Sequence, residues 1–142
     1  MGPTKNGTVA FHGCVGEDAF ARVVRARLEE RGVVPHLTPL SGHPTGCCIV
    51  LSGGSERAFV TCAGAAGRIA AEHIADITAA VRKATGPVHI HFGGFYSYGP
   101  LRWEIPDFVQ GLRVAAKEQG VVLTVSADTN GSEPAHLKGL NE

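Results

Sequence analysis

Residues 87–92 have the sequence Pro-Val-His-Ile-His-Phe, and residues 93–96 follow as Gly-Gly-Phe-Tyr. An amphipathic segment comes next, before Val-Val-Leu-Thr-Val at 121–125 and Asp-Thr-Asn-Gly at 128–131. This order predicts a strand, a crossover helix and a second strand, which is how two parallel strands are joined. The loops that follow both strands should therefore emerge at one edge of a parallel sheet, where open α/β sheets bind small molecules.

Glycine and polar residues at this edge form a candidate small-molecule site. Gly93 and Gly94 would let a ligand approach the backbone closely, and Asp128 and Asn130 would direct polar groups at it. An ordinary turn is the alternative for residues 128–131, because Asp, Asn and Gly all favour turns. The sequence thus predicts a ligand site at this edge or, for its second half, a plain turn.

Composition narrows the classes of protein. The chain has 142 residues, with 13 basic and 13 acidic residues and no net charge, which suits one domain with a real core. It has neither a Lys/Arg cluster nor an apolar run near the ~20 residues of a membrane span. We therefore predict no nucleic-acid or membrane partner. Residues 1–6 lack the apolar stretch of a signal peptide, which favours a cytoplasmic protein.

The four cysteines, at positions 14, 47, 48 and 62, match no zinc-binding spacing. We expect them to be reduced, small core residues, as free cysteines often are.

Further elements surround the central unit. The apolar pattern predicts a strand at 8–11, a helix at about 18–31 and another helix that ends near Gly86. Residues 33–39 are expected to be extended, and a short helix is expected at about 134–140. The elements therefore alternate as in an α/β domain, apart from one insertion.

The insertion is a predicted hairpin over about 44–63, two β-rich runs around a Gly-Gly turn. A hairpin inserted in an α/β domain is often a lid. Arg57 on its second strand is then either a polar anchor for the ligand or a solvated residue that guards a sheet edge. Residues 64–67, Gly-Ala-Ala-Gly, either offer amides to an anion or simply lead into the next helix.

Two side-chain groups leave alternatives open. His89 and His91 lie two apart on a strand and share a face, so they either bind zinc or pack under a helix and reach a polar partner, which we favour. Tyr96, Tyr98 and Trp103 cluster just past the Gly-Gly loop. They either stack on a ligand or cover the edge of the sheet.

Seven short motifs in this order resemble the PfkB (ribokinase-like) family of carbohydrate and nucleoside kinases. They are Gly13–Ala21, Gly32–Val33, Pro44–Gly46, Gly54–Phe59, Gly64–Ala66, Gly93–Phe95 and Val125–Asn130. Order and spacing agree over nearly the whole chain. Two positions depart from the family pattern, because Ala21 replaces a common Gly and Ala66 the usual Asn.

The resemblance implies an α/β, ribokinase-like fold, with a parallel sheet flanked by helices and a small β-hairpin lid insertion. Residues 1–142 would be a partial domain. The implied activity is ATP-dependent phosphoryl transfer to a hydroxymethyl group of a sugar or nucleoside, with ATP and Mg²⁺ as cofactors. The residues that it implies for substrate binding are Arg57, Phe59, Gly93, Gly94, Asp128 and Asn130.

The family's segments for ATP, magnesium and the general base are expected outside these 142 residues. We therefore predict no catalytic residue and no metal ligand in this chain, and no kinase activity of the chain alone. The alternative is a non-catalytic α/β fragment that binds a sugar or assembles with another chain. A homodimer through the lid is a further expectation from the resemblance.

Overall fold

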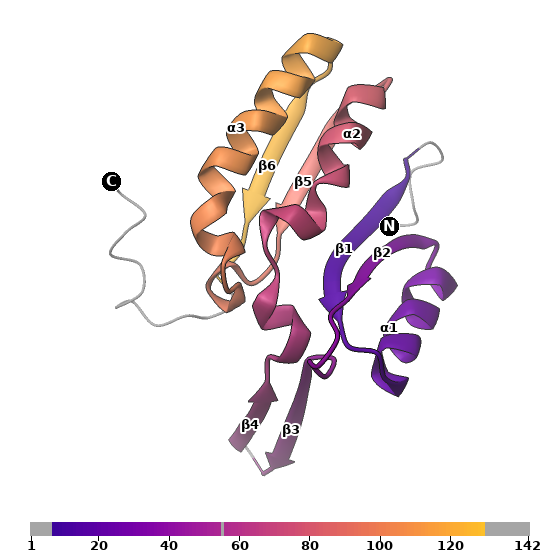
Figure 1. Ribbon diagram of the computed structural model, residues 1–142. Helices are drawn as coiled ribbons and strands as arrows, with labels where there is room; N and C mark the ends of the chain where they lie inside the picture. The colour runs from indigo at the N-terminus through magenta and orange to yellow at the C-terminus, as the bar shows by residue number, and fades with distance from the viewer. Residues whose placement is uncertain (1–6, 55, 130–142) are drawn as a thin grey trace. The chain divides into compact units, whose positions relative to one another are not determined.

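The computed structural model describes residues 7–54 and 56–129. The chain divides into two compact units, Met1–Arg68 and Ile69–Glu142. In Figure 1 the first unit is coloured from indigo to magenta, and the second from magenta to yellow. The helix expected at 134–140 lies outside the described residues.

The first unit begins with a strand, a helix and a second strand. Strand β1 (Val9–Val15) and helix α1 (Ala19–Glu30) agree with the predicted strand and helix. Strand β2 (Val33–Pro39) pairs with β1 in parallel along its whole length. The sequence indicated only an extended segment there, because two prolines interrupt it. A strand that pairs on one side tolerates proline, and β1 is the single neighbour of β2 among the described strands.

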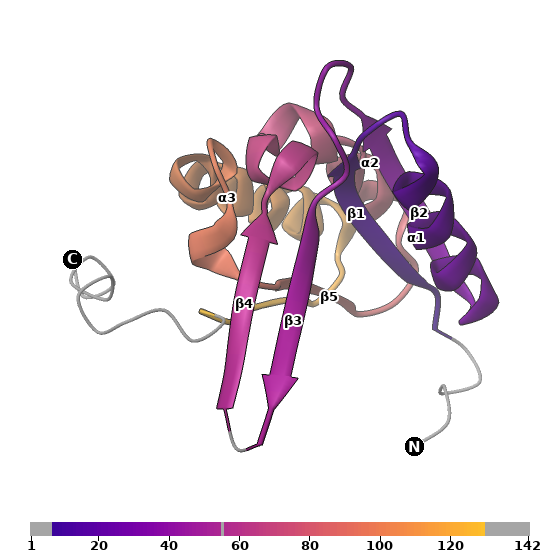
Figure 2. The ribbon, with the colours of Figure 1, turned by 90° about the horizontal axis from the view of Figure 1, so that it is seen from below.

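The predicted hairpin is present as two antiparallel strands, β3 (Cys47–Gly53) and β4 (Glu56–Cys62). Figure 2 shows them as a long two-stranded ribbon. Every described residue of both strands is exposed to solvent. Side chains alternate between the two faces of such a ribbon, and residues opposite one another share a face.

The two faces of the hairpin differ in chemistry. Residues of the apolar face, as we call it, are Cys47, Ile49, Leu51, Ala58, Val60 and Cys62; the pair Gly53 and Glu56 lies on the same side next to the turn. Residues of the mixed face are Cys48, Val50, Ser52, Arg57, Phe59 and Thr61.

The expectation that all four cysteines are core residues is wrong for three of them. Cys14 is buried at the end of β1, whereas Cys47, Cys48 and Cys62 are exposed, and all four are free thiols. The hairpin strands are as apolar as core strands, so the sequence pattern could not distinguish them from buried ones.

The second unit contains the predicted strand–helix–strand arrangement. Helix α2 (Asp76–Lys83) precedes strand β5 (Val88–Phe92), helix α3 (Leu101–Gln119) and strand β6 (Leu123–Ala127). Strands β5 and β6 pair in parallel, which confirms the crossover predicted from the sequence. Both helices lie alongside the two strands in Figure 1.

The core of this unit joins both helices to one face of the strands. Its buried members are Val81, Leu112, Ala115 and Ala116. The partly buried residues packed against them are Ile77, Val88, Ile90, Phe108, Val121 and Leu123. Val88 and Ile90 therefore face the helices, and the alternate residues of β5, His89 and His91, lie on the opposite face.

The chain thus has the expected fold class, an α/β partial domain with parallel strands, flanking helices and an antiparallel hairpin. Among the described residues, no helix combines the length and the apolar character that a membrane span needs.

Candidate functional site

The loops that follow β5 and β6 meet at one edge, as predicted, and backbone hydrogen bonds join them. Asp128 donates its amide to the Phe92 carbonyl at 3.1 Å, and its own carbonyl accepts the Phe95 amide at 2.8 Å. The Asp128 carboxylate also accepts the Gly94 amide, with Oδ1 3.0 Å from the nitrogen. Asp128 therefore fixes the Gly93–Gly94 loop through both its backbone and its side chain.

Gly94 needs to be a glycine because its backbone is left-handed, with φ 71° and ψ 48°. It is buried, whereas its neighbour Gly93 is exposed. A Cβ placed on Gly93 would lie 3.6 Å from Asp128 Oδ2 and 3.8 Å from the His91 ring. The exposed Gly93 backbone and the Asp128 carboxylate thus border the same small surface.

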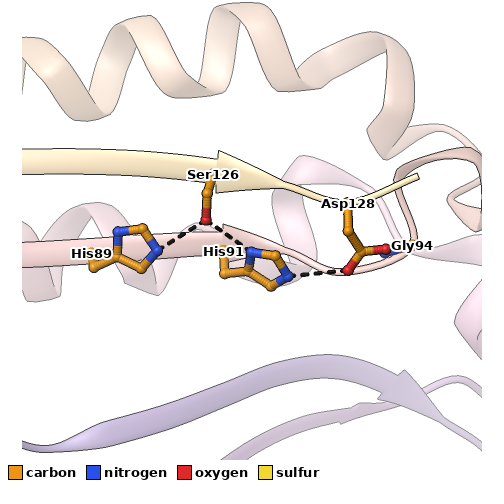
Figure 3. Close-up of polar contacts among 5 residues, drawn as sticks. All are labelled: His89, His91, Gly94, Ser126 and Asp128. Carbon is orange, nitrogen blue, oxygen red and sulfur yellow. Dashed lines mark hydrogen bonds and ion pairs between the residues drawn. The ribbon is translucent and has the colours of Figure 1, made fainter. Parts of the chain in front are cut away.

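A row of polar side chains runs along the solvent face of β5 and β6 to this surface (Figure 3). His89 Nδ1 lies 2.7 Å from Thr124 Oγ1, and His89 Nε2 lies 2.9 Å from Ser126 Oγ. His91 Nδ1 lies 2.9 Å from the same Ser126 oxygen, and His91 Nε2 lies 3.1 Å from Asp128 Oδ2. We call these five residues the polar row. The histidine pair thus reaches polar partners, which is the interpretation that we favoured over zinc.

Tyr98 belongs to the same neighbourhood. Burial raises the pKa of its phenol, and the negative charge of Asp128 raises this pKa further, while a hydrogen bond to the Gly93 backbone lowers it. The phenol therefore stays protonated at neutral pH. Trp103 is different, because it is 74% exposed and stacks on the Arg102 guanidinium at 4.3 Å from the ring centroid.

Arg57 and Phe59, the other expected substrate-binding residues, lie on β4 in the first unit. They share the mixed face of the hairpin, and both are exposed. Gly93, Gly94 and Asp128 lie together in the second unit. Asn130 lies outside the described residues.

The base of the hairpin is tied to the start of α1 by Asp18 and Thr45. Asp18 is the N-cap of α1 and accepts the Ala21 amide at 3.0 Å. It also accepts the Thr45 amide and the Thr45 hydroxyl, each at 2.7 Å. The buried Thr45 hydroxyl in turn accepts the Gly16 amide at 2.9 Å. Asp18 and Thr45, which lie 27 residues apart in two different motifs, therefore form a joint between the start of α1 and the base of the hairpin.

These hydrogen bonds affect the ionisation of Asp18. The Thr45 amide, the Thr45 hydroxyl and the Ala21 amide, in that order, hold the pKa of its carboxyl below the ordinary value. Gly16 has no room for a side chain, since a Cβ would lie 2.5 Å from the His43 carbonyl oxygen and 2.6 Å from the Thr45 nitrogen.

The glycine-containing segment after the hairpin does not fit the phosphates of ATP. Residues Gly64–Arg68 form a 3₁₀ helix rather than a loop with outward amides. The Ala65 amide is already bonded to the Pro44 carbonyl at 2.8 Å, and the Gly67 amide to Ala63 at 3.3 Å. An anion site needs free amides. We therefore derive no step that passes through ATP or Mg²⁺ on the described residues.

The sequence left His91 open between zinc binding and a polar partner, left Tyr98 open between ligand stacking and covering the sheet edge, and gave Thr45 no role beyond its motif. The alternation of β5 had placed both histidines on one face, but only the register with β6 shows that this face continues to Asp128. Tyr98 lies four positions beyond Gly94 and Thr45 lies within a quoted motif. Their partners are distant in sequence, so neither contact could be inferred from spacing.

Comparison with known proteins identifies relatives among sugar and nucleoside kinases. Residues 2–139 match the model of the pfkB family carbohydrate kinases. Adenosine kinase from Dictyostelium discoideum is 41% identical over 66 residues, which are 46% of this chain and 19% of that protein. The chain thus spans about a fifth of the length of this curated relative.

Solved structures agree with the family match. Ribokinase from Giardia lamblia superposes with a TM-score of 0.68 and 25% identity, over 88% of this chain and 38% of that one. A protein from E. coli assigned as a ribokinase II, in complex with ATP and Mg²⁺, has a TM-score of 0.65 and 22% identity, over 94% and 40%. The chain belongs to the pfkB family of carbohydrate kinases.

Proposed function

We propose that this chain carries the substrate-binding edge and the lid of an ATP- and Mg²⁺-dependent kinase for a sugar or nucleoside. The observation that carries the proposal is the family match over residues 2–139. The joined loops at Gly94 and Asp128 support it, because they lie at the edge where α/β sheets bind small molecules. The reaction is phosphoryl transfer to a hydroxymethyl group.

Within this reaction, the described residues bind and orient the substrate. Asp128 accepts a hydrogen bond from a substrate hydroxyl, and the exposed backbone of Gly93 allows close approach. Arg57 and Phe59 supply a polar and an apolar contact from the mixed face of the hairpin. Asn130, which the family resemblance also implies for substrate binding, is proposed to add an amide contact. A closing hairpin would exclude water, which limits hydrolysis of the phosphoryl donor.

No residue of these 142 is assigned as the general base, which accepts the proton of the attacking hydroxyl. A base and preorganised donors for the developing charge each supply orders of magnitude in rate. We therefore expect the chain by itself to bind substrate without turning it over. Because the donor is ATP, the reaction belongs in a compartment that contains ATP, and cytoplasmic localisation stays a prediction.

Ligand titration of the purified chain tests this proposal. Ribose, fructose and adenosine are titrated separately while amide NMR signals are recorded. We expect saturable shifts at residues 93–95 and 128 with at least one ligand. Asp128→Ala should abolish them, and the matched variant Asp107→Ala, on the exposed side of α3, should not. Absence of binding by all three ligands, or equal binding by both variants, would count against the site.

A coupled assay of ADP release with the same ligands tests the expectation that the chain alone is inactive. We expect no turnover above background from the chain alone. Measured turnover would show that a catalytic base lies within these residues. In a chain that also carries the family's remaining segments, Arg57→Ala should lower kcat/KM. The loss of transition-state stabilisation should be about 1–3 kcal/mol, the range for a hydrogen bond to a charged group. The matched change Arg82→Ala, on α2, should leave it unchanged.

The alternative function, assembly with another chain, is favoured by the apolar face of the hairpin. Ile49, Leu51 and Val60 are each more than half exposed, and an isolated two-stranded ribbon is marginal in water. We propose that two copies of this chain pair through this face and leave the mixed face for the ligand. Light scattering at micromolar concentration should then report a dimer.

Opposite faces of β3 provide the control for this dimer. Ile49→Ser together with Leu51→Ser should give a monomer, whereas Val50→Ser on the mixed face should not. A monomeric wild-type chain at all concentrations would exclude this assembly.

A further inference from the structure

Each hydrogen bond of the polar row has a donor and an acceptor, and the Asp128 carboxylate at the end of the row determines which partner is which. An ionised carboxylate can only accept hydrogen bonds, so His91 Nε2 must carry the proton toward Asp128 Oδ2. In a neutral imidazole the other nitrogen is then an acceptor, and His91 Nδ1 accepts the hydroxyl proton of Ser126.

The same logic continues along the strand. Ser126 has one hydroxyl proton, which it gives to His91, so its oxygen accepts from His89 Nε2. His89 Nδ1 then accepts the Thr124 hydroxyl at 2.7 Å, because the Val88 carbonyl, the other acceptor for this hydroxyl, lies farther away at 3.5 Å. All four hydrogen bonds thus donate toward Asp128. Hydrogen bonds aligned in one direction polarise one another, which strengthens the last of them.

We propose that His91 and His89 are positioning residues for Asp128, because the polar row holds its carboxylate in one orientation. This inference deepens the proposed function and rests on it. Asp128 Oδ1 is engaged by the Gly94 amide and Oδ2 by His91, so the carboxylate has one orientation.

The chemistry of the edge follows from this arrangement. Within the proposed function, the Asp128 carboxylate is a hydrogen-bond acceptor of fixed orientation beside the exposed Gly93 backbone. Among the described residues of this unit, His91 and Tyr98 are titratable groups that face Asp128. Neither His91 nor Asp128 is deeply buried, because both side chains are 50% exposed. A ligand hydroxyl can therefore reach the carboxylate without displacing the row.

Reversal of the row by Asp128→Asn provides a test that needs no ligand. The single oxygen of the new amide is required by the Gly94 amide, so its NH₂ group faces His91 Nε2. His91 must then become protonated at Nδ1, Ser126 must donate to His89 Nε2, and His89 must become protonated at Nδ1. The ring ¹⁵N shifts of both histidines report this directly, at about pH 8.5, well above the ordinary range of imidazole titration.

We expect Nε2–H tautomers of both histidines in the wild-type chain and Nδ1–H tautomers of both in Asp128→Asn. Adding Ser126→Ala to Asp128→Asn removes the hydroxyl that links the two rings. The tautomer of His91 should then still change, and the tautomer of His89 should not. An unchanged His89 in Asp128→Asn would overturn the directional row. A change of His89 despite Ser126→Ala would overturn it equally, because the signal would not pass through the hydroxyl.

Ligand affinity then tests the positioning role. With the ligand that binds in the titration above, His91→Ala should weaken binding about tenfold, the loss expected for a hydrogen bond to a charged group. His91→Gln, which keeps a donor, should restore part of it. Equal affinities of wild type and His91→Ala would overturn the positioning role. If no ligand binds while the tautomers reverse as expected, the proposed function fails and the directional row stands.

Discussion

At the scale of single residues, Asp18 shows how one carboxylate can serve two elements. It caps α1 and holds the first residues of the hairpin through Thr45. Its pKa is lower in the folded chain than in the unfolded chain because hydrogen bonds from Thr45, Ala21 and Phe20 stabilise its charged form. A depressed folded pKa gives stability that is present above the unfolded value, about 3.9, and is lost as the pH falls through the folded value.

Replacing Asp18 by Asn should therefore destabilise the chain at neutral pH and make little difference in acid. An amide oxygen cannot accept from all the donors that surround this position. Urea denaturation at several pH values measures the gap between wild type and variant. We expect the gap to close as the pH falls below about 4. The surface change Asp107→Asn is the control, and a gap independent of pH would contradict the assignment.

Thr45→Val should cost about 1–3 kcal/mol of unfolding free energy. The change keeps the shape of the side chain but leaves the buried Gly16 amide without its hydroxyl acceptor. Thr45→Ser should recover most of the loss. Thr61→Val on the exposed β4 strand is the matched control and should change little. Similar losses in both valine variants would mean that the hydroxyl of Thr45 has no special role.

The sequence identified these residues as members of motifs, but it could not predict which of them contact one another. Asp18 and Thr45 stood in two of the quoted motifs, yet their contact spans 27 residues and depends on how the chain returns after β2. His91 and Asp128 were both visible at the predicted edge. Their connection requires the register of β5 with β6, which side-chain alternation does not determine.

At the scale of elements, prediction succeeded where a single pattern decided the result. The strand–helix–strand unit and the hairpin followed from apolar periodicity and glycine turns. β2 was missed as a paired strand because Pro35 and Pro39 obscure its pattern. Burial in the hairpin was misjudged, because apolar alternation reports what a strand could bury and not what covers it.

The register of the hairpin places Cys47 directly opposite Cys62. Opposed residues in antiparallel strands have Cα atoms about 4.5–5.5 Å apart, within the 4.4–6.8 Å range of disulfides. Oxidised glutathione should therefore form a Cys47–Cys62 disulfide within one chain, detected by mass spectrometry of tryptic peptides. Cys48, which is opposite Thr61, should remain free. Predominant linkage of Cys48 to Cys62 would indicate a register shifted by one residue.

At the scale of the whole molecule, the chain consists of two units with separate reporters. Its only tryptophan and both tyrosines lie in the second unit, at positions 103, 96 and 98. Aromatic fluorescence therefore follows the second unit, while far-UV circular dichroism follows both. Units within one chain unfold independently unless a large interface joins them.

We expect Leu112→Ala to lower the stability seen by fluorescence by about 2–5 kcal/mol, because Leu112 is fully buried in the core of the second unit. Thr45→Val should alter the circular dichroism transition and leave fluorescence unchanged. Val114→Ala, at an exposed position of α3, is the control for Leu112. Coincident transitions that shift together in both variants would show a single cooperative unit.

The joint between Asp18 and Thr45 also determines which part of the hairpin is interchangeable. The fixed attachment of the hairpin consists of Gly16, Asp18, Thr45 and the 3₁₀ helix that begins at Gly64. A Cβ on Gly64 would clash with the Pro44 carbonyl. The described residues of β3 and β4, between Gly46 and Ala63, are all exposed and make none of the hydrogen bonds of this joint. A hairpin of another length or composition, grafted between these two points, should therefore inherit the same attachment to α1. Substrate preference could then diversify by exchange of the ribbon alone, while the body of the domain stays constant.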